Sequence, residues 1–252
     1  KDSDVLIIDA SKGFEKDGKN NKLRACDIKR IVDAYKERPE KIKKFARRVS
    51  RAEIIQNDYN LNIPRYVDSS EKAESWDIYA SMFGGIPEAE LQDLSAYWTA
   101  FPHLKAALFS PDNEAYCRLN VANLKNAVLS HPDVVAFKTA FQNAFGDFDA
   151  YLKSALIDGM TQLNAAGEEE RLSREIFARL AGIPLVDRYA AYQLLDDDWK
   201  KIAIDLEIIQ TEGFAATKQV DPNMVLKKDA EVQDGWVGHV LPFELVQNVK
   251  MH

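Results

Sequence analysis

The sequence lacks the short motifs that mark common enzyme sites. It contains no Gly-x-Gly, which excludes a dinucleotide fingerprint and a phosphate-binding loop. It also contains no His-Glu-x-x-His, no Cys-x-x-Cys and no Gly-x-Ser-x-Gly, so nothing indicates a zinc peptidase, a redox dithiol or an α/β-hydrolase. The carboxylates are scattered, and no catalytic, cofactor-binding or metal-binding residue is predicted. The residues alone indicate a docking or scaffolding domain and not a self-sufficient enzyme.

Cysteine and long apolar runs are also scarce. The two cysteines, Cys26 and Cys117, lie far apart in the sequence, which argues against a disulfide framework or a zinc site and fits a reducing compartment. No apolar run approaches the roughly 20 residues that cross a bilayer, and we expect neither a signal peptide nor a membrane partner. The sequence therefore predicts a cytoplasmic location.

A long amphipathic stretch is the strongest feature that is present. Residues 185–219 carry apolar side chains at steps of three and four, which predicts one buried stripe on an α-helix of roughly 40 Å. Pro184 precedes the stretch and Gly213 supplies a stop. Asp196, Asp197 and Asp198 are expected on its solvated face. The stripe consists of Leu185, Tyr189, Tyr192, Leu195, Trp199, Ile202, Leu206 and Ile209.

The rest of the chain predicts a mainly α fold, an irregular multi-helix bundle with one orphan N-terminal strand and a short C-terminal β-hairpin. The apolar run Val5–Ile8 is typical of a strand in a parallel sheet, yet a single strand makes no sheet. Ser173 is expected to cap a helix that runs to Gly182. The hairpin is expected at 224–226 and 236–241, where glycines punctuate extended segments, with a last helix at 243–246.

Positive charge is concentrated near the N-terminus. Residues 1–51 hold 16 Lys and Arg against 9 Asp and Glu, a net charge of +7, whereas the whole chain has a net charge of −7. Within residues 36–51 the basic side chains interleave with Phe45, which suits contact with a nucleic-acid backbone. The alternative is a solvated charged face. The residues predicted to bind DNA are Lys41, Lys43, Lys44, Arg47, Arg48 and Arg51.

The most unusual local string is NDYNLNIPRYV at residues 57–67. Three asparagines and one aspartate within six residues favour a tight turn, and Pro64 favours an extended exit. We expect this turn to dock Tyr59, Leu61, Ile63 and Tyr66 onto a core.

Five strings together resemble the modification subunit of type I restriction–modification systems. They are VLIIDAS (5–11), NDYNLNIPRYV (57–67), IPLVDRYAAYQLLDDDW (183–199), LEIIQTEGFAATKQVDPNMV (206–225) and GWVGHVLPFELVQ (235–247). The strings occur in order and extend over nearly the whole chain. The resemblance implies an adenine-specific DNA methyltransferase that uses S-adenosylmethionine. It also implies assembly of two modification subunits with one specificity subunit, to which restriction subunits are added.

The departures from that family matter equally. The Phe-x-Gly-x-Gly cofactor loop and the catalytic Asn-Pro-Pro-Phe are not among these residues, so no catalytic or cofactor residue is carried over. We expect a C-terminal region of the subunit, which serves assembly with the specificity subunit and DNA clamping and binds no cofactor itself. The expected domains are 1–68, the end of the methyltransferase domain with a basic connector; 69–219, helical; and 220–252, the hairpin and the start of a tail. The alternative is a stand-alone helical adaptor without a role in methylation.

Overall fold

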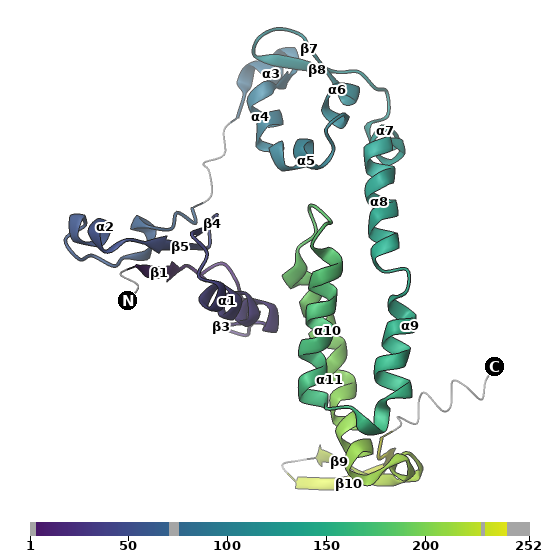
Figure 1. The fold of residues 1–252 in the computed structure, drawn as a ribbon. Helices are drawn as coiled ribbons and strands as arrows, with labels where there is room; N and C mark the ends of the chain where they lie inside the picture. The colour runs from purple at the N-terminus through teal and green to yellow at the C-terminus, as the bar shows by residue number, and fades with distance from the viewer. Residues whose placement is uncertain (1–3, 71–75, 228–229, 241–252) are drawn as a thin grey trace. The chain divides into compact units, whose positions relative to one another are not determined.

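The computed structural model describes residues 4–70, 76–227 and 230–240 (Figure 1). The predicted mainly α fold is confirmed, with small antiparallel sheets between the helices. The chain divides into two compact units, residues 1–140 with 182–193 and residues 141–181 with 194–252. The three domains expected from the sequence stay a prediction.

The N-terminal strand has a partner. β1 (Val5–Ile8) pairs antiparallel with β5 (Ala46–Val49), which pairs in turn with β4 (Lys41–Ile42). The expectation of an orphan strand or a parallel sheet is therefore wrong. The partner was hidden because two arginines separate its buried ends, Ala46 and Val49. The same segment contains β2 (Glu15–Asp17), β3 (Asn20–Lys22), α1 (Ala25–Glu37), α2 (Arg51–Gln56) and η1 (Ile63–Arg65).

Both faces of this sheet are covered. Ile7 belongs to a cluster with Val49 of β5 and Ile54 of α2, whereas Leu6 and Ile8 pack against a second cluster that includes Ala34 of α1. Successive side chains of a strand point to opposite faces, so the sheet separates two small apolar cores. This arrangement fixes α1 and the β4–β5 turn with respect to the end of β1.

Residues 76–131 form a small mixed region. Its sheet has the order β6-β8-β7 and is antiparallel, and its core contains Phe101, Leu104 and Leu108. The sequence patterns do not predict this sheet, because two of its strands have only two and three residues and each includes a proline. The elements up to the following long helix are α3 (Ile78–Phe83), β6 (Ile86–Pro87), α4 (Glu88–Asp93), α5 (Ser95–Ala100), α6 (Leu104–Leu108), β7 (Phe109–Pro111), β8 (Tyr116–Leu119), α7 (Leu124–Ser130) and α8 (Pro132–Ala144).

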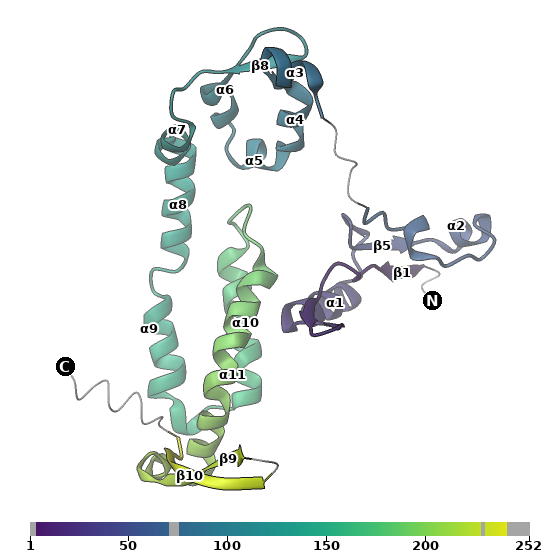
Figure 2. The same ribbon diagram turned by 180° about the vertical axis from the view of Figure 1, so that it is seen from behind.

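The second unit is built on α10 (Ala165–Leu180) and on α11 (Arg188–Glu212) from residue 194 onward, whereas residues 188–193 of α11 belong to the first unit. Helices α10 and α11 lie side by side in both views (Figures 1 and 2). Leu172 of α10 packs with Trp199 and Leu206 of α11. Ser173 does not cap α10, because the helix begins after Asn164, whose side chain accepts a hydrogen bond from the Gly167 amide at 3.1 Å. The unit also contains α9 (Phe148–Leu152), the π-helical η2 (Lys153–Asp158), η3 (Met160–Gln162) and η4 (Phe214–Lys218).

The long helix predicted from the sequence is confirmed. α11 has 25 residues and ends before Gly213, although it begins after Leu185, whose φ of 64° is not helical. Trp199 lies in the core as expected. Asp196, expected on the solvated face, is instead only 7% exposed, and its carboxylate accepts from the Lys200 ammonium at 2.5 Å.

The C-terminal β-hairpin is also confirmed. β9 (Val220–Lys227) pairs antiparallel with β10 (Ala230–Gly238), so the hairpin is longer than predicted. The register shifts between Gln233 and Trp236, where Gly235 adopts a φ of 84°. The expected tail and its helix at 243–246 lie outside the described residues.

Candidate nucleic-acid interface

The basic stretch forms a hairpin with a lysine turn at its tip. Lys41 lies in β4, and Lys43 with Lys44 forms the turn into β5, where a hydrogen bond from the Phe45 amide to the Ile42 carbonyl at 3.1 Å closes the turn. All three lysines are exposed. Lys44 has a φ of 58°, a conformation that turns the chain back sharply. The structure therefore gathers three of the six predicted DNA-binding residues at one place.

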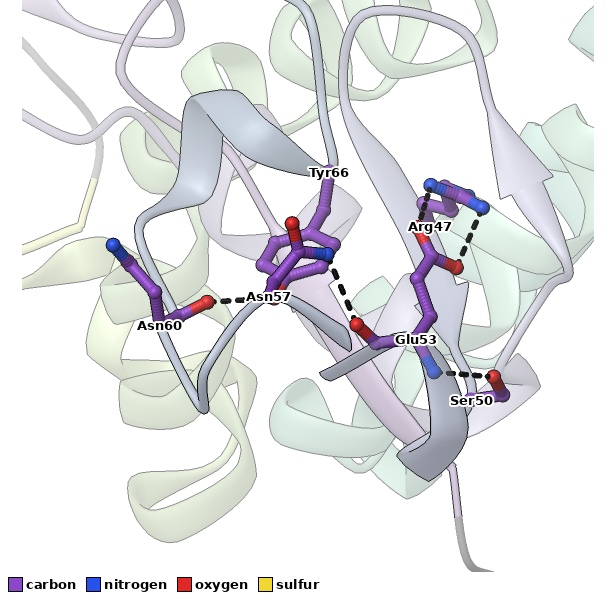
Figure 3. A network of polar contacts seen from close by, with 6 residues as sticks. All are labelled: Arg47, Ser50, Glu53, Asn57, Asn60 and Tyr66. Carbon is purple, nitrogen blue, oxygen red and sulfur yellow. Dashed lines mark hydrogen bonds and ion pairs between the residues drawn. The ribbon is translucent and has the colours of Figure 1, made fainter. Parts of the chain in front are cut away.

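The three predicted arginines are placed differently. Arg47 is paired through both terminal nitrogens with the Glu53 carboxylate at 2.9 Å each (Figure 3). Arg48 is exposed and lies 3.8 Å from Asp4. Arg51 begins α2, beyond the end of β5 that is opposite the lysine turn. A bidentate pair holds a guanidinium firmly, so Arg47 has a structural contact where the sequence predicted a DNA contact.

A hollow of about 260 Å³ adjoins the lysine turn at the end of β1. We call it the basic pocket. Its charged lining residues are Lys12, Arg24, Arg30, Lys43, Lys44, Asp9 and Asp27. Sequence reasoning missed the first three, because they come from the loop after β1 and from α1 and its N-cap, outside the densest basic run. A second hollow of about 380 Å³ shares both lysines of the turn and includes Lys41 and Tyr66.

The two carboxylates of the basic pocket already have partners. Asp9 accepts from the Ser11 amide at 3.0 Å and from the Ser69 hydroxyl at 2.5 Å, and the hydrogen bonds from these serines lower the pKa of Asp9. Asp27 accepts from the Arg24 side chain at 2.9 and 3.1 Å, which likewise lowers the pKa of Asp27. Both groups are therefore anionic at neutral pH and satisfied within the fold.

Arg30 is held by aromatic rings. Its guanidinium carbon lies 4.2 Å from the centre of the Phe45 ring and 5.9 Å from that of Tyr189. Cation–π contacts within about 6 Å are attractive, and they leave the nitrogen donors at the edge of the guanidinium plane able to make hydrogen bonds. Residues from three parts of the chain thus fix one cation at the pocket.

The NDYNLNIPRYV string folds into a tight structure beside the hairpin (Figure 3). Asp58 and Tyr59 both have positive φ, 53° and 57°, and the Tyr66 hydroxyl donates to the Asn60 carbonyl at 2.6 Å. The predicted turn is therefore confirmed, but the predicted extended exit is wrong, because Pro64 lies in the 3-10 helix η1. Of the four residues expected to dock, only Tyr66 is buried, and the others, Tyr59, Leu61 and Ile63, are exposed. The left-handed conformation of Asp58 and Tyr59 directs residues 59–63 toward solvent.

Other kinds of site are not found among residues 4–70, 76–227 and 230–240. No group of three or more His, Cys, Asp or Glu side chains there could hold a metal ion. None of the helices in these ranges is both long and apolar enough to pass through a membrane. Both cysteines are unpaired and buried.

The first part of the chain is similar to known DNA methylases. Residues 1–75 match the family described as N-6 DNA Methylase. The methylase subunit of the type I restriction enzyme MpnII from Mycoplasma pneumoniae is 35% identical over 74 residues. The methylase subunit of the type I restriction enzyme MjaVII from Methanocaldococcus jannaschii is 43% identical over 77 residues. The predicted resemblance to type I modification subunits is thereby confirmed.

These matches are partial. Each of the two curated relatives matches 29% of this chain, and the chain spans 13% of the length of each relative. A solved type I restriction-modification methyltransferase subunit from Streptococcus thermophilus is 52% identical in the matched part, which covers 27% of this chain and 14% of that one with a TM-score of 0.26.

Proposed function

We propose that this chain is part of the modification subunit of a type I restriction–modification system, an adenine-specific DNA methyltransferase. The observation that carries the proposal is the match of residues 1–75 to N-6 DNA methylases, supported by the two curated methylase subunits. Within that subunit, this chain holds the DNA backbone and contributes to assembly. Its partners are DNA, a specificity subunit, a second modification subunit and a restriction subunit, and the complex works in the cytoplasm.

The lysine turn supplies the DNA contact. Lys41, Lys43 and Lys44 lie at one end of an exposed hairpin, next to a pocket with further cations. Lysine contacts to phosphates position a protein on DNA without reading its sequence. Such contacts also help to hold a duplex from which a base has been flipped, a step that costs a few kcal/mol. The sequence to be methylated is then chosen by the specificity subunit.

The helical residues supply assembly surfaces. In and beside α3, Trp76 is 83% exposed and Met82 and Phe83 are each 70% exposed. Clustered exposed apolar residues of this size are typical of protein–protein contacts. This surface supports docking to another subunit of the complex.

The intact subunit would take its methyl group from S-adenosylmethionine, but the described residues of this chain do not fit that cofactor. The hollow at the end of β1 has an excess of cationic side chains, which disfavours the positively charged sulfonium. Asp9, the carboxylate at that strand end, is engaged by Ser11 and Ser69. We therefore assign no step of methyl transfer to these residues.

DNA binding by the whole chain at several salt concentrations tests the proposal. Lys41→Gln, Lys43→Gln and Lys44→Gln are combined in one variant. Each lost phosphate contact reduces the slope of log affinity against log salt by roughly 0.9, so the variant should show a clearly lower slope and weaker binding. The matched control combines Lys125→Gln, Lys138→Gln and Lys218→Gln, three exposed lysines outside the hairpin. Equal slopes for the two variants would contradict the proposed DNA contact.

A further inference from the structure

The basic pocket carries an excess of positive charge that its own carboxylates do not balance. Five cationic and two anionic side chains line it, which leaves a net charge of +3. Asp27 is matched by Arg24, and Asp9 is satisfied by serines. Within the described residues, Lys12 and Lys43 make no hydrogen bond or ion pair. An excess of cations in a concave site is unfavourable unless an anion or solvent compensates for it.

The walls of the pocket are fixed before any ligand arrives. Arg30 is held against the Phe45 and Tyr189 rings. The loop that carries Lys12 packs closely on α1, because a Cβ atom at Gly13 would lie 2.8 Å from the Asp27 Oδ1 atom and the Asp27 side chain would have to shift to admit it. A preorganised site binds with a smaller loss of conformational entropy.

The size and donors of the pocket select the ligand. About 260 Å³ is several times the roughly 30 Å³ that one water occupies, which admits a tetrahedral oxyanion together with part of an attached sugar. Lys12 and Lys43 provide ammonium donors, and Arg30 provides a planar guanidinium, a combination that suits phosphate oxygens. A divalent cation would be repelled by the same charges.

We propose that the basic pocket is a binding site for a phosphoryl group, recognised by Lys12, Arg30 and Lys43. Two sources share this chemistry, a phosphodiester of DNA and the phosphate of a free nucleotide. Binding of a DNA phosphodiester rests on the proposed function, because the pocket would then bind one backbone phosphate beside the lysine turn. The site itself rests only on the geometry and charge of its residues.

Backbone-amide NMR shifts of the whole chain, titrated with pyrophosphate, test the site. Saturable shifts are expected at Lys12, Gly13 and Lys43. The double variant Lys12→Gln with Lys43→Gln should bind pyrophosphate about tenfold more weakly or worse, because two charge-assisted contacts are lost. The matched control is Lys19→Gln with Lys22→Gln, which removes the same charge from the exposed β2–β3 hairpin and should bind like the unmodified chain. Arg30→Lys keeps the charge but loses the planar donor, and it should also weaken binding.

Three ligands separate the sources. A duplex without terminal phosphates presents diesters only, adenosine monophosphate presents a monoester only, and adenosine presents neither. Shifts of the pocket amides with the duplex identify a phosphodiester as the ligand, and shifts with adenosine monophosphate identify a phosphomonoester. Shifts with adenosine as large as those with the phosphorylated ligands would overturn the proposal. So would the absence of saturable shifts with pyrophosphate, or equal affinity in the two double variants. If the pocket binds pyrophosphate but the lysine-turn variant binds DNA normally, the proposed DNA contact is contradicted and the phosphoryl site is supported. If the pocket does not bind pyrophosphate but the lysine-turn variant binds DNA more weakly, the phosphoryl site is contradicted and the DNA contact is supported.

Discussion

At the scale of single residues, Ser173 is a buried hydroxyl with no hydrogen-bond partner among the described residues. It is fully buried in α10, next to Leu172, which lies in the core with Trp199. An unsatisfied buried hydroxyl destabilises the fold by roughly 1–3 kcal/mol, and alanine favours helix more than serine does. Ser173→Ala should therefore raise the free energy of unfolding by about 1 kcal/mol or more in a urea titration.

The matched control for that change is Ser154→Ala, at an exposed position of the second unit. Its effect should stay within about 0.5 kcal/mol, as for most surface substitutions. Destabilisation by Ser173→Ala would mean that the hydroxyl has a partner in solution, for example a buried water.

Single residues also show how much of the geometry of the candidate site can be anticipated from the sequence. The lysines of the β4–β5 turn were predicted from charge density alone, and the structure gathers them. Arg47 has the same charge, yet its pairing with Glu53 depends on α2 folding back beside β5, which a charge count does not reveal. Lys12 and Arg30 reach the pocket only through the packing of α1 on the sheet.

At the scale of elements, the end of α11 depends on Gly213. Its φ of 79° and ψ of 177° lie in a region that is essentially restricted to glycine, where other residues cost about 1–3 kcal/mol. A Cβ atom there would meet nothing within 4 Å, so backbone strain is the whole effect. Gly213→Ala should lower the free energy of unfolding by about 1–3 kcal/mol, measured by chemical denaturation.

Gly182 provides the comparison for this helix stop. A Cβ atom added at Gly182 would also meet nothing within 4 Å, but the φ of this residue is not left-handed. Gly182→Ala should change the free energy of unfolding by less than about 0.5 kcal/mol. Similar losses for both substitutions would argue against backbone strain as the cause.

The C-terminal hairpin is connected to α11 by a histidine. His239 Nδ1 lies 2.6 Å from Asp221 of β9, and Nε2 lies 3.3 Å from Glu212 at the end of α11. The Asp221 carboxylate, with Glu212, raises the pKa of His239 above its ordinary value. Protonated His239 therefore favours the folded state below about pH 6.5, its usual pKa in an unfolded chain, and this contribution disappears as the pH rises through the folded-state value.

Thermal melting across this pH range measures the effect. The second unit should lose stability as the pH rises through the titration of His239. His239→Gln should flatten that dependence, and Asp221→Asn should reduce it because the principal cause of the shift is removed. A pH dependence that is the same in all three proteins would show that another group is responsible.

Elements also differ in how far they can be predicted. The stripe from Trp199 to Ile209 and the glycine stop predicted α11, because helical periodicity is local. The partner of β1 lies about forty residues away in β5, and no local pattern encodes such a pairing. Asp196 shows a further limit: a charge run predicts solvation, but the 3.6-residue period turns one of three consecutive aspartates toward the core.

At the scale of the whole molecule, residues far apart in the chain meet where α1 contacts the start of α11. The Gln193 side-chain oxygen accepts a hydrogen bond from the Cys26 amide at 3.0 Å, across 167 residues of sequence. Lys29 lies over the Tyr192 ring at 5.3 Å. The first amides of a helix have no partner within the helix, so Gln193 satisfies a donor of α1 that would otherwise depend on solvent.

Removing the hydrogen bond between Gln193 and the Cys26 amide should destabilise the first turn of α1. Gln193→Ala should destabilise the start of α1 by about 1 kcal/mol and raise the hydrogen-exchange rate of the Cys26 amide roughly fivefold. Leu194→Ala changes the neighbouring residue, which is 69% exposed, and should leave that exchange rate unchanged. If Gln193→Ala also leaves it unchanged, the Cys26 amide obtains its protection elsewhere. If both substitutions raise it, the effect comes from the stability of α11, and the single hydrogen bond is not what protects the start of α1.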